Sequence, residues 1–279
     1  MIALGFAAAF LSAVLAYGGS AMQAFEARKA PRSEALQLGL LLALVRRRLW
    51  VGGTVLNIVA FAVQVLALSL ASLAVVQPTL AVGLIVLAAI ARWKLGEDVD
   101  LRTSAGITAI IAGLVGLAVV APRHDHLPQT TTTALVLAGA FALIALLLVA
   151  MRVLSHKGGL VASLAAGLAY AWLAFSGALL GESFRGHSWI SLSVWGIGTV
   201  VAAILALTAE MTALQSWPVT RSKPVIFVLQ TLLPALAAPF FAAAGFGPFH
   251  GVPFAISLLV VSAGAAAVGA SESVAKVAA

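Results

Sequence analysis

The sequence has no cysteine and very little charge. Asp, Glu, Lys and Arg together make up 9% of its 279 residues, whereas soluble domains carry about a quarter. The missing cysteines exclude disulfides, thiol catalysis and cysteine-based metal sites. The sequence also has no glycine-rich phosphate loop and no Ser/His/Asp grouping, so we expect neither ATP hydrolysis nor nucleophilic catalysis. These absences predict a protein that is not an enzyme and needs no cofactor.

Apolar residues are what the sequence has in abundance. They make up 62% of the chain, its mean hydropathy is +1.11, and they fall in uncharged runs of about twenty residues. A helix of that length crosses a hydrocarbon core of about 30 Å and satisfies its own backbone hydrogen bonds. We therefore predict an all-α integral membrane protein without a soluble domain. Nine runs are long enough to be spans: Ile2–Met22, Trp50–Leu70, Ala71–Ala91, Thr103–Ala121, Thr133–Val153, Gly159–Leu180, Trp189–Leu214, Pro224–Ala244 and Val252–Ala270.

A tenth run, Ala35–Val45, is uncharged but has only 11 residues, or about 16 Å of helix. If it does not cross, 14 of the 16 Lys and Arg lie on one side of the membrane, and if it crosses, 11 do. Lys and Arg favour cytoplasmic loops, so both arrangements place the C-terminus in the cytoplasm, and the charge asymmetry favours nine crossings. The basic residues behind the net charge of +7 lie in these loops, so we expect no nucleic-acid partner.

The two halves of the chain share a spacing. Gln64 and Pro78 are 14 residues apart, as are Glu210 and Pro224, and each pair joins one span to the next through a hairpin. The first of these spans runs outward and its counterpart runs inward, which predicts inverted repeats over residues 1–122 and 123–279. Full inversion needs five spans in each half, with Ala35–Val45 as a short second helix. We therefore expect ten crossings, with nine as the alternative.

Several short motifs carry a family resemblance. They are Arg46–Arg48, Trp50-Val-Gly-Gly, Gln64-Val-Leu-Ala-Leu, Ala74-Val-Val-Gln-Pro-Thr-Leu and Leu95-Gly-Glu97. In these motifs the chain resembles the drug/metabolite transporter superfamily, and within it the bacterial NIPA-like and EamA-like members. The resemblance implies two inverted halves of five helices, with nine helices proposed for the NIPA branch. It also implies secondary transport of small metabolites or cations.

Polar and helix-breaking residues within the predicted spans are the candidates for a substrate pathway. They are Asn57, Gln64, Gln77, Pro78, Glu210, Pro224 and Gln230. Amides inside a bilayer either line a pathway or hydrogen-bond to a neighbouring helix. Proline frees a backbone carbonyl, which coordinates a ligand or only kinks the helix. The residues alone leave these alternatives open.

Glu210 is the most informative side chain because it is the only acidic residue inside a predicted span. An ionisable group in hydrocarbon costs several kcal/mol unless it meets water or a partner. We expect it either to bind a cation or proton, as the coupling residue of a transporter, or to pair with Arg221 or Lys223. We predict no resident metal site, since a magnesium pathway would need several carboxylates and the spans contain one.

The last predicted span of each half carries small residues four apart. They are Ala105, Ala109 and Gly113 in the first half, and Ser262, Ala266 and Ala270 in the second. Such stripes allow helices to approach closely. We expect them to pack the two halves together or to join two copies in a homodimer.

Together these features predict a secondary transporter in the cytoplasmic membrane. It would move a small solute or cation by alternating access, with the lipid bilayer and its substrate as partners. The alternatives are a NIPA-like magnesium or divalent-cation transporter and a non-transporting accessory membrane protein.

Overall fold

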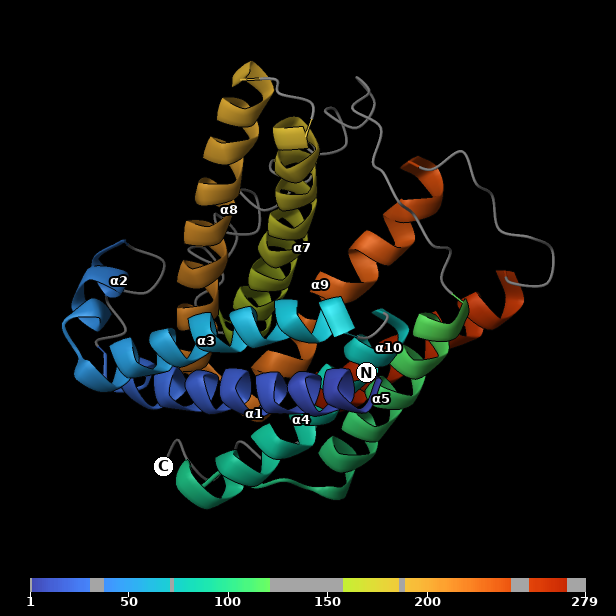
Figure 1. Ribbon diagram of the computed structural model, residues 1–279. Helices are drawn as coiled ribbons and strands as arrows, with labels where there is room; N and C mark the ends of the chain where they lie inside the picture. Colours follow the sequence, from blue (N-terminus) through green and yellow to red (C-terminus); the bar gives the residue numbers. More distant parts are fainter. Residues whose placement is uncertain are drawn as a thin grey trace.

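The computed structural model describes residues 2–30, 38–70, 73–120, 158–185, 189–241 and 251–269, and the regular secondary structure within these ranges is helical (Figure 1). The all-α prediction is confirmed for this part of the chain. The helices are α1 (Ile2–Ala27), α2 (Leu38–Val45), α3 (Arg48–Leu70), α4 (Leu73–Lys94), α5 (Leu101–Val120), α7 (Gly158–Arg185), α8 (Trp189–Ser216), α9 (Val219–Phe241) and α10 (Gly251–Gly269).

Among the described residues, three helices contain stretches that are long and apolar enough to cross a membrane, namely Ala3–Ala27, Trp195–Ser216 and Gly251–Val268. These helices support the expectation of a membrane protein. Each predicted span falls on a described helix except Thr133–Val153, which lies outside the described residues. Hydropathy therefore located the helices well, although it does not establish how many of them cross.

The helices pack mainly as neighbouring pairs. α1 lies along α3, α7 along α8, and α5 along α10, and in Figure 1 the α1–α3 pair is steeply inclined to the α7–α8 pair. α4 lies against α1 and α5, and α9 lies against α7 and α10. Elements from both predicted halves therefore share one packed interior.

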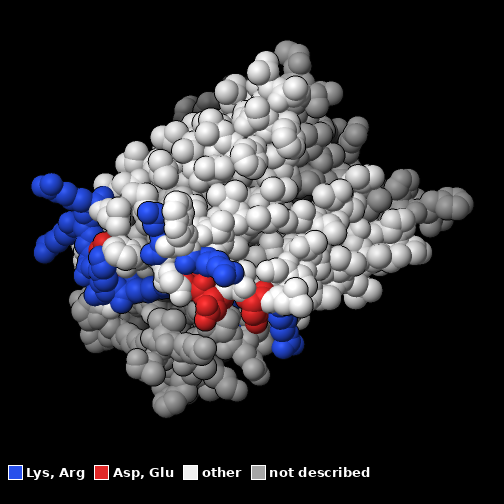
Figure 2. All heavy atoms as spheres, turned by 90° about the horizontal axis from the view of Figure 1, so that it is seen from below, with Lys and Arg blue, Asp and Glu red and all other residues white. Residues whose placement is uncertain are grey.

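Helix ends and loops that carry charge meet on one side of the molecule. We call this region the charged face: residues 26–30, 46–48, 92–101 and 217–223. Arg47 pairs with Glu26 at the end of α1, and Glu97 contacts both Arg28 and Thr220. Figure 2 shows Lys, Arg, Asp and Glu gathered here, while much of the remaining visible surface of described residues carries none of them.

The short helix α2 does not behave as a crossing helix in the described residues. Its eight residues span about 12 Å, well short of a hydrocarbon core. Arg28 precedes α2 and Arg47 follows it, yet both side chains bind carboxylates of the charged face. A crossing helix would separate its flanks by the membrane thickness. Residues 35–37 of the predicted run Ala35–Val45 lie outside the described part of the chain, and the contacts of Arg28 and Arg47 favour the nine-crossing alternative.

α5 and α10 pack antiparallel through small residues, as expected for the last helices of the two halves. A Cβ added to Gly106 would lie 2.6 Å from Val268 Cγ2, and one added to Gly113 would lie 2.8 Å from the Val261 nitrogen. Of the predicted stripes, Gly113 lies in this contact, whereas Ala105, Ser262 and Ala266 are exposed and Ala109 is half-buried. Ala270 lies outside the described residues. The alternative role of the stripes, in a homodimer, stays a prediction.

Apart from Gly113, the residues that pack are neighbours of the predicted ones. The buried positions of this contact are Gly106, Ile110, Gly113 and Leu117 on α5, and Ser257, Val261, Gly264 and Val268 on α10. Their separations alternate between four and three, which keeps a row of side chains on one side of a 3.6-residue helix. A strict four-residue row drifts away from the neighbouring helix, so Gly113 lies in the contact and Ala105 does not.

Candidate functional site

Glu210 is buried between three helices. It lies on α8 and is 2% exposed. The Tyr170 hydroxyl of α7 donates a hydrogen bond to Glu210 Oε2 at 2.5 Å, and the Lys223 ammonium of α9 forms an ion pair with Glu210 Oε1. One buried carboxylate is therefore shared by a phenol and an ammonium from the two neighbouring helices.

Small side chains allow the three helices to approach around Glu210. The buried residues of this contact are Ala162, Ala165 and Ala166 of α7, Ala209 and Ala213 of α8, and Ile226 of α9. A Cβ added to Gly167 would lie 2.6 Å from Leu229 Cβ, so α7 and α9 also approach closely here. The alanine-rich sequence thus brings Tyr170 and Lys223 within reach of the carboxylate.

The Glu210 site lies inside the helix bundle but near the charged face. Glu210 precedes Ser216, the last residue of α8, by six positions, and Lys223 follows Val219, the first residue of α9, by four. At 1.5 Å per residue these groups lie about 9 Å and about 6 Å from those helix ends. The pairing expected with Lys223 is present, and the ion pair neutralises the carboxylate in the state that the structure describes.

Trp50 joins the other half of the molecule to this site. Its indole N–H donates to the Sδ atom of Met211 at 3.2 Å, and both side chains are buried. Met211 follows Glu210 directly, so the start of α3 lies beside the turn of α8 that carries the carboxylate. This contact crosses between the two predicted halves.

Asn57, in contrast, belongs to a polar network between α1 and α3. Its side-chain N–H donates to Gln23 Oε1 at 3.0 Å, and Gln23 Nε2 donates to Thr54 Oγ1 at 3.1 Å. Gly19 and Gly53 make this network possible, because a Cβ on either would lie 2.6 Å from the carbonyl oxygen of the other. Of the two roles predicted for Asn57, the structure displays the interhelical hydrogen bond.

The remaining predicted pathway residues are spread over three helices. Gln64 and Gln230 are half-buried on α3 and α9, and Pro224 is buried on α9 beside Lys223. Gln77 and Pro78 lie within α4, and their side chains are outside the described part of the structure. The structure thus brings Pro224 to the neighbourhood of Glu210, whereas Asn57 hydrogen-bonds to Gln23 of α1.

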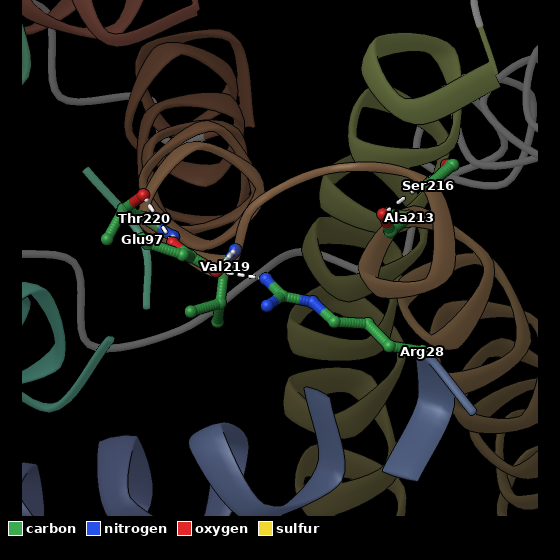
Figure 3. Close-up of polar contacts among 6 residues, drawn as sticks. All are labelled: Arg28, Glu97, Ala213, Ser216, Val219 and Thr220. Carbon is green, nitrogen blue, oxygen red and sulfur yellow. Dashed lines mark hydrogen bonds and ion pairs between the residues drawn. The ribbon is translucent and has the colours of Figure 1, made fainter. Parts of the chain in front are cut away.

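Glu97 links both halves of the molecule, and the sequence did not identify it as a site. Its carboxylate accepts hydrogen bonds from the backbone N–H groups of Val219 and Thr220, at 2.8 and 3.0 Å, and from Thr220 Oγ1 at 2.6 Å. Arg28 completes the cluster with an ion pair. Figure 3 shows Arg28 reaching from the end of α1 toward the first turn of α9, where Glu97 lies.

The position of Glu97 complements the start of α9. The first N–H groups of a helix have no partner within it and carry a partial positive charge. A carboxylate that is 4% exposed satisfies two of these groups and is itself compensated. Gly96, with φ +65°, turns the chain after α4, so that Glu97 N–H bonds to the Ala91 carbonyl at 3.1 Å. Leu95-Gly-Glu97 was noticed in the sequence, but the capping of a helix over a hundred residues away has no local signal.

Asp100 caps α5 at the same face. Its Oδ1 accepts the backbone N–H of Thr103 at 2.7 Å. Burial raises the pKa of this carboxyl, but the hydrogen bonds from Thr103 and the charge of Arg221 outweigh that effect, and the net pKa is below its usual range. Asp100 is therefore ionised at neutral pH and holds the start of α5 beside the Glu97 cluster.

Tyr170 is the other important residue that the sequence analysis missed. It is one of only two tyrosines in the chain and lies within a predicted span, where a phenol needs a polar partner. Glu210 is the carboxylate within a predicted span, so the sequence did contain a signal that Tyr170 and Glu210 pair with each other.

Comparisons with known proteins do not assign a family to this chain. The chain matches no protein-family model, no curated protein and no solved structure. Its interpretation therefore depends on the contacts of its own residues.

Proposed function

We propose that this chain is a secondary transporter of the drug/metabolite transporter type, which moves a small solute or cation across the cytoplasmic membrane by alternating access. The observation that carries the proposal is Glu210, a carboxylate buried among apolar helices and held by Tyr170 and Lys223. Ionisable groups in such positions are costly and typically mark ion or proton pathways. Glu210 is the coupling residue in this proposal.

The helix directions are consistent with inverted halves. α3 begins at the charged face and α8 ends there, while α5 and α10 pack antiparallel. Inverted repeats place a substrate site between the halves and alternate its access by rocking one against the other. Glu97 and Trp50 join the halves near the charged face, so we infer that the structure corresponds to a state closed on that side.

The charge of the site favours a proton, a monovalent cation or an organic solute over magnesium. Mg²⁺ is usually held by oxygen ligands including one or two carboxylates. Glu210 is the one carboxylate of the described site, and the Lys223 ammonium compensates it. A divalent ion would have to displace Lys223 and would still meet a single negative charge.

The proposal is tested by uptake into proteoliposomes, with and without a pH gradient, over a panel of labelled cations and metabolites. We expect gradient-dependent uptake of at least one solute by the wild type and its loss in Glu210→Gln. Asp98→Asn is the matched control, because it makes the same change at an exposed carboxylate of the charged face. Uptake unchanged in Glu210→Gln would reduce Glu210 to a structural ion pair, and no uptake of any solute would favour an accessory protein.

A further inference from the structure

The charged face has more basic groups than its carboxylates compensate. Glu26 is occupied by Lys29 and Arg47, and Glu97 by Arg28 and the start of α9. The Asp100 carboxylate caps α5. These three carboxylates therefore bind groups within the fold and do not pair with the exposed Arg46 and Arg48.

Arg46 and Arg48 are the basic residues of the Arg46–Arg48 triplet that point outward. Between them, Arg47 binds Glu26 Oε2 at 3.0 Å and the Lys29 carbonyl at 3.4 Å. This inward contact fixes the backbone between α2 and α3. Arg46 and Arg48 are both exposed, and in the described part of the chain no carboxylate pairs with either of them.

The same two arginines mark a boundary between charge and apolar surface. On α2, Leu40 and Leu44 are fully buried, whereas Leu42 and Val45 are 68% and 54% exposed. On α3, large apolar side chains are exposed from Leu49 onward, namely Leu49, Val51, Val55, Ile58, Val59, Phe61 and Leu66. An outward surface of this kind suits acyl chains, so Arg46 and Arg48 lie at the depth where lipid headgroups begin.

We propose that Arg46 and Arg48 bind the phosphate headgroup of an anionic phospholipid, while the outer side of α2 lies among the acyl chains of the same leaflet. Guanidinium groups match phosphate oxygens in charge and geometry, and basic residues at a membrane surface are attracted to anionic lipids. The exposed Arg92 and Lys94 at the end of α4 add to the positive potential of this face. The proposal depends on the chain being in a membrane and not on what it transports.

The test uses the full chain in nanodiscs of phosphatidylcholine with and without phosphatidylglycerol. Bound anionic lipid is measured by native mass spectrometry, and thermal unfolding is followed by the fluorescence of the six tryptophans. We expect phosphatidylglycerol to bind the wild type and raise its unfolding midpoint. The double variant Arg46→Gln/Arg48→Gln should bind it about 25-fold more weakly, at about fivefold for each arginine, and unfold as the wild type does in pure phosphatidylcholine.

Arg47→Gln is the matched control, since it removes the same charge from the same triplet. Because Arg47 holds Glu26 inside the fold, this variant should unfold at a lower temperature in both lipids while it keeps the response to phosphatidylglycerol. The proposal is overturned if the wild type does not respond to phosphatidylglycerol, or if the double variant responds fully. It is also overturned if inorganic phosphate reproduces the effect in pure phosphatidylcholine, because the occupant would then not be a lipid.

Discussion

At the scale of single residues, three carboxylates account for most of the polar organisation. Glu210 and Glu97 accept hydrogen bonds from distant helices and are almost fully buried, while Asp100 accepts the N–H of Thr103 in the first turn of α5. Buried carboxylates persist only when such partners offset their desolvation. Glu97 and Asp100 cap helices and so have a structural role, whereas the coupling role is proposed for Glu210 alone.

We expect Glu97→Ala to be strongly destabilising. The change leaves the Val219 and Thr220 N–H groups buried without an acceptor and removes the partner of Arg28, at a cost of about 2–3 kcal/mol. The measurement is thermal unfolding in detergent. Asp98→Ala, at the exposed neighbouring position, should leave the midpoint unchanged. Equal midpoints for the two variants would contradict the capping role of Glu97.

Asp100 gives a prediction about pH. The pKa of the Asp100 carboxyl is lowered in the folded state, so its ionised form stabilises the fold. This stability is fully present above the usual Asp pKa of about 3.9 and is lost as the pH falls through the lower pKa of the folded state. Asn also caps helices but does not titrate. The wild type should therefore be more stable than Asp100→Asn at neutral pH, and this advantage should disappear in acid. An advantage that does not change from neutral pH to strong acid would refute the assignment.

At the scale of the helices, the sequence predicted positions better than it predicted faces. The ends of α1 and α9 differ from the predicted spans, because Glu26 pairs with Arg47 beyond the apolar run of α1 and Glu97 caps α9 before Pro224. These are contacts between distant segments, so no local pattern encodes them. The α5–α10 contact was expected and Gly113 of the predicted stripes lies in it, but a strict four-residue spacing also selected Ala105, Ser262 and Ala266, which are exposed.

Gly264 tests the α5–α10 contact directly. A Cβ at this position would lie 2.7 Å from the Gly106 carbonyl oxygen and 2.9 Å from the Ile110 nitrogen. Since backbone atoms cannot rotate away, Gly264→Ala should force the helices apart and cost about 1–3 kcal/mol in thermal or denaturant unfolding. Gly198→Ala is the control, because a Cβ there meets no atom within 4 Å. A fully stable Gly264→Ala protein would mean that the two helices do not pack this closely.

At the scale of the whole molecule, the path of the chain around α2 decides which side the N-terminus occupies. Residues on both sides of α2 bind carboxylates of the charged face, so we predict that α1 crosses the membrane and that α2 does not. The N-terminus would then lie opposite the charged face. This is the nine-crossing alternative to the ten crossings that the repeat suggests.

The absence of cysteine makes this topology easy to measure. We expect single cysteines at Lys29 and Arg46 to react with a membrane-impermeant maleimide from the same side of oriented vesicles. Trp189→Cys, at the exposed start of α8, should react from the opposite side. Labelling of positions 29 and 46 from opposite sides would show that the segment between them crosses.

Of the residues predicted to line a substrate pathway, the structure brings Pro224 close to Glu210, and a pathway through them stays a prediction. Glu210 was recognisable as the single carboxylate within an apolar run, and its pairing with Lys223 was among the alternatives. Tyr170 was missed because its role depends on how α7 packs, and Asn57 turned out to bond to Gln23 of α1. One-dimensional patterns identify which residues are unusual in a bilayer, while the packing of helices decides which of them meet.

The most direct test of the account is counterflow in proteoliposomes, using a solute identified by the uptake screen. A carrier that alternates its access exchanges labelled solute outside for unlabelled solute inside, and so accumulates the label transiently without any ion gradient. The account predicts this overshoot for the wild type and for Asp98→Asn, and loss of pH-driven uptake in Glu210→Gln. Flux without any overshoot, or gradient-driven uptake that survives in Glu210→Gln, would contradict it.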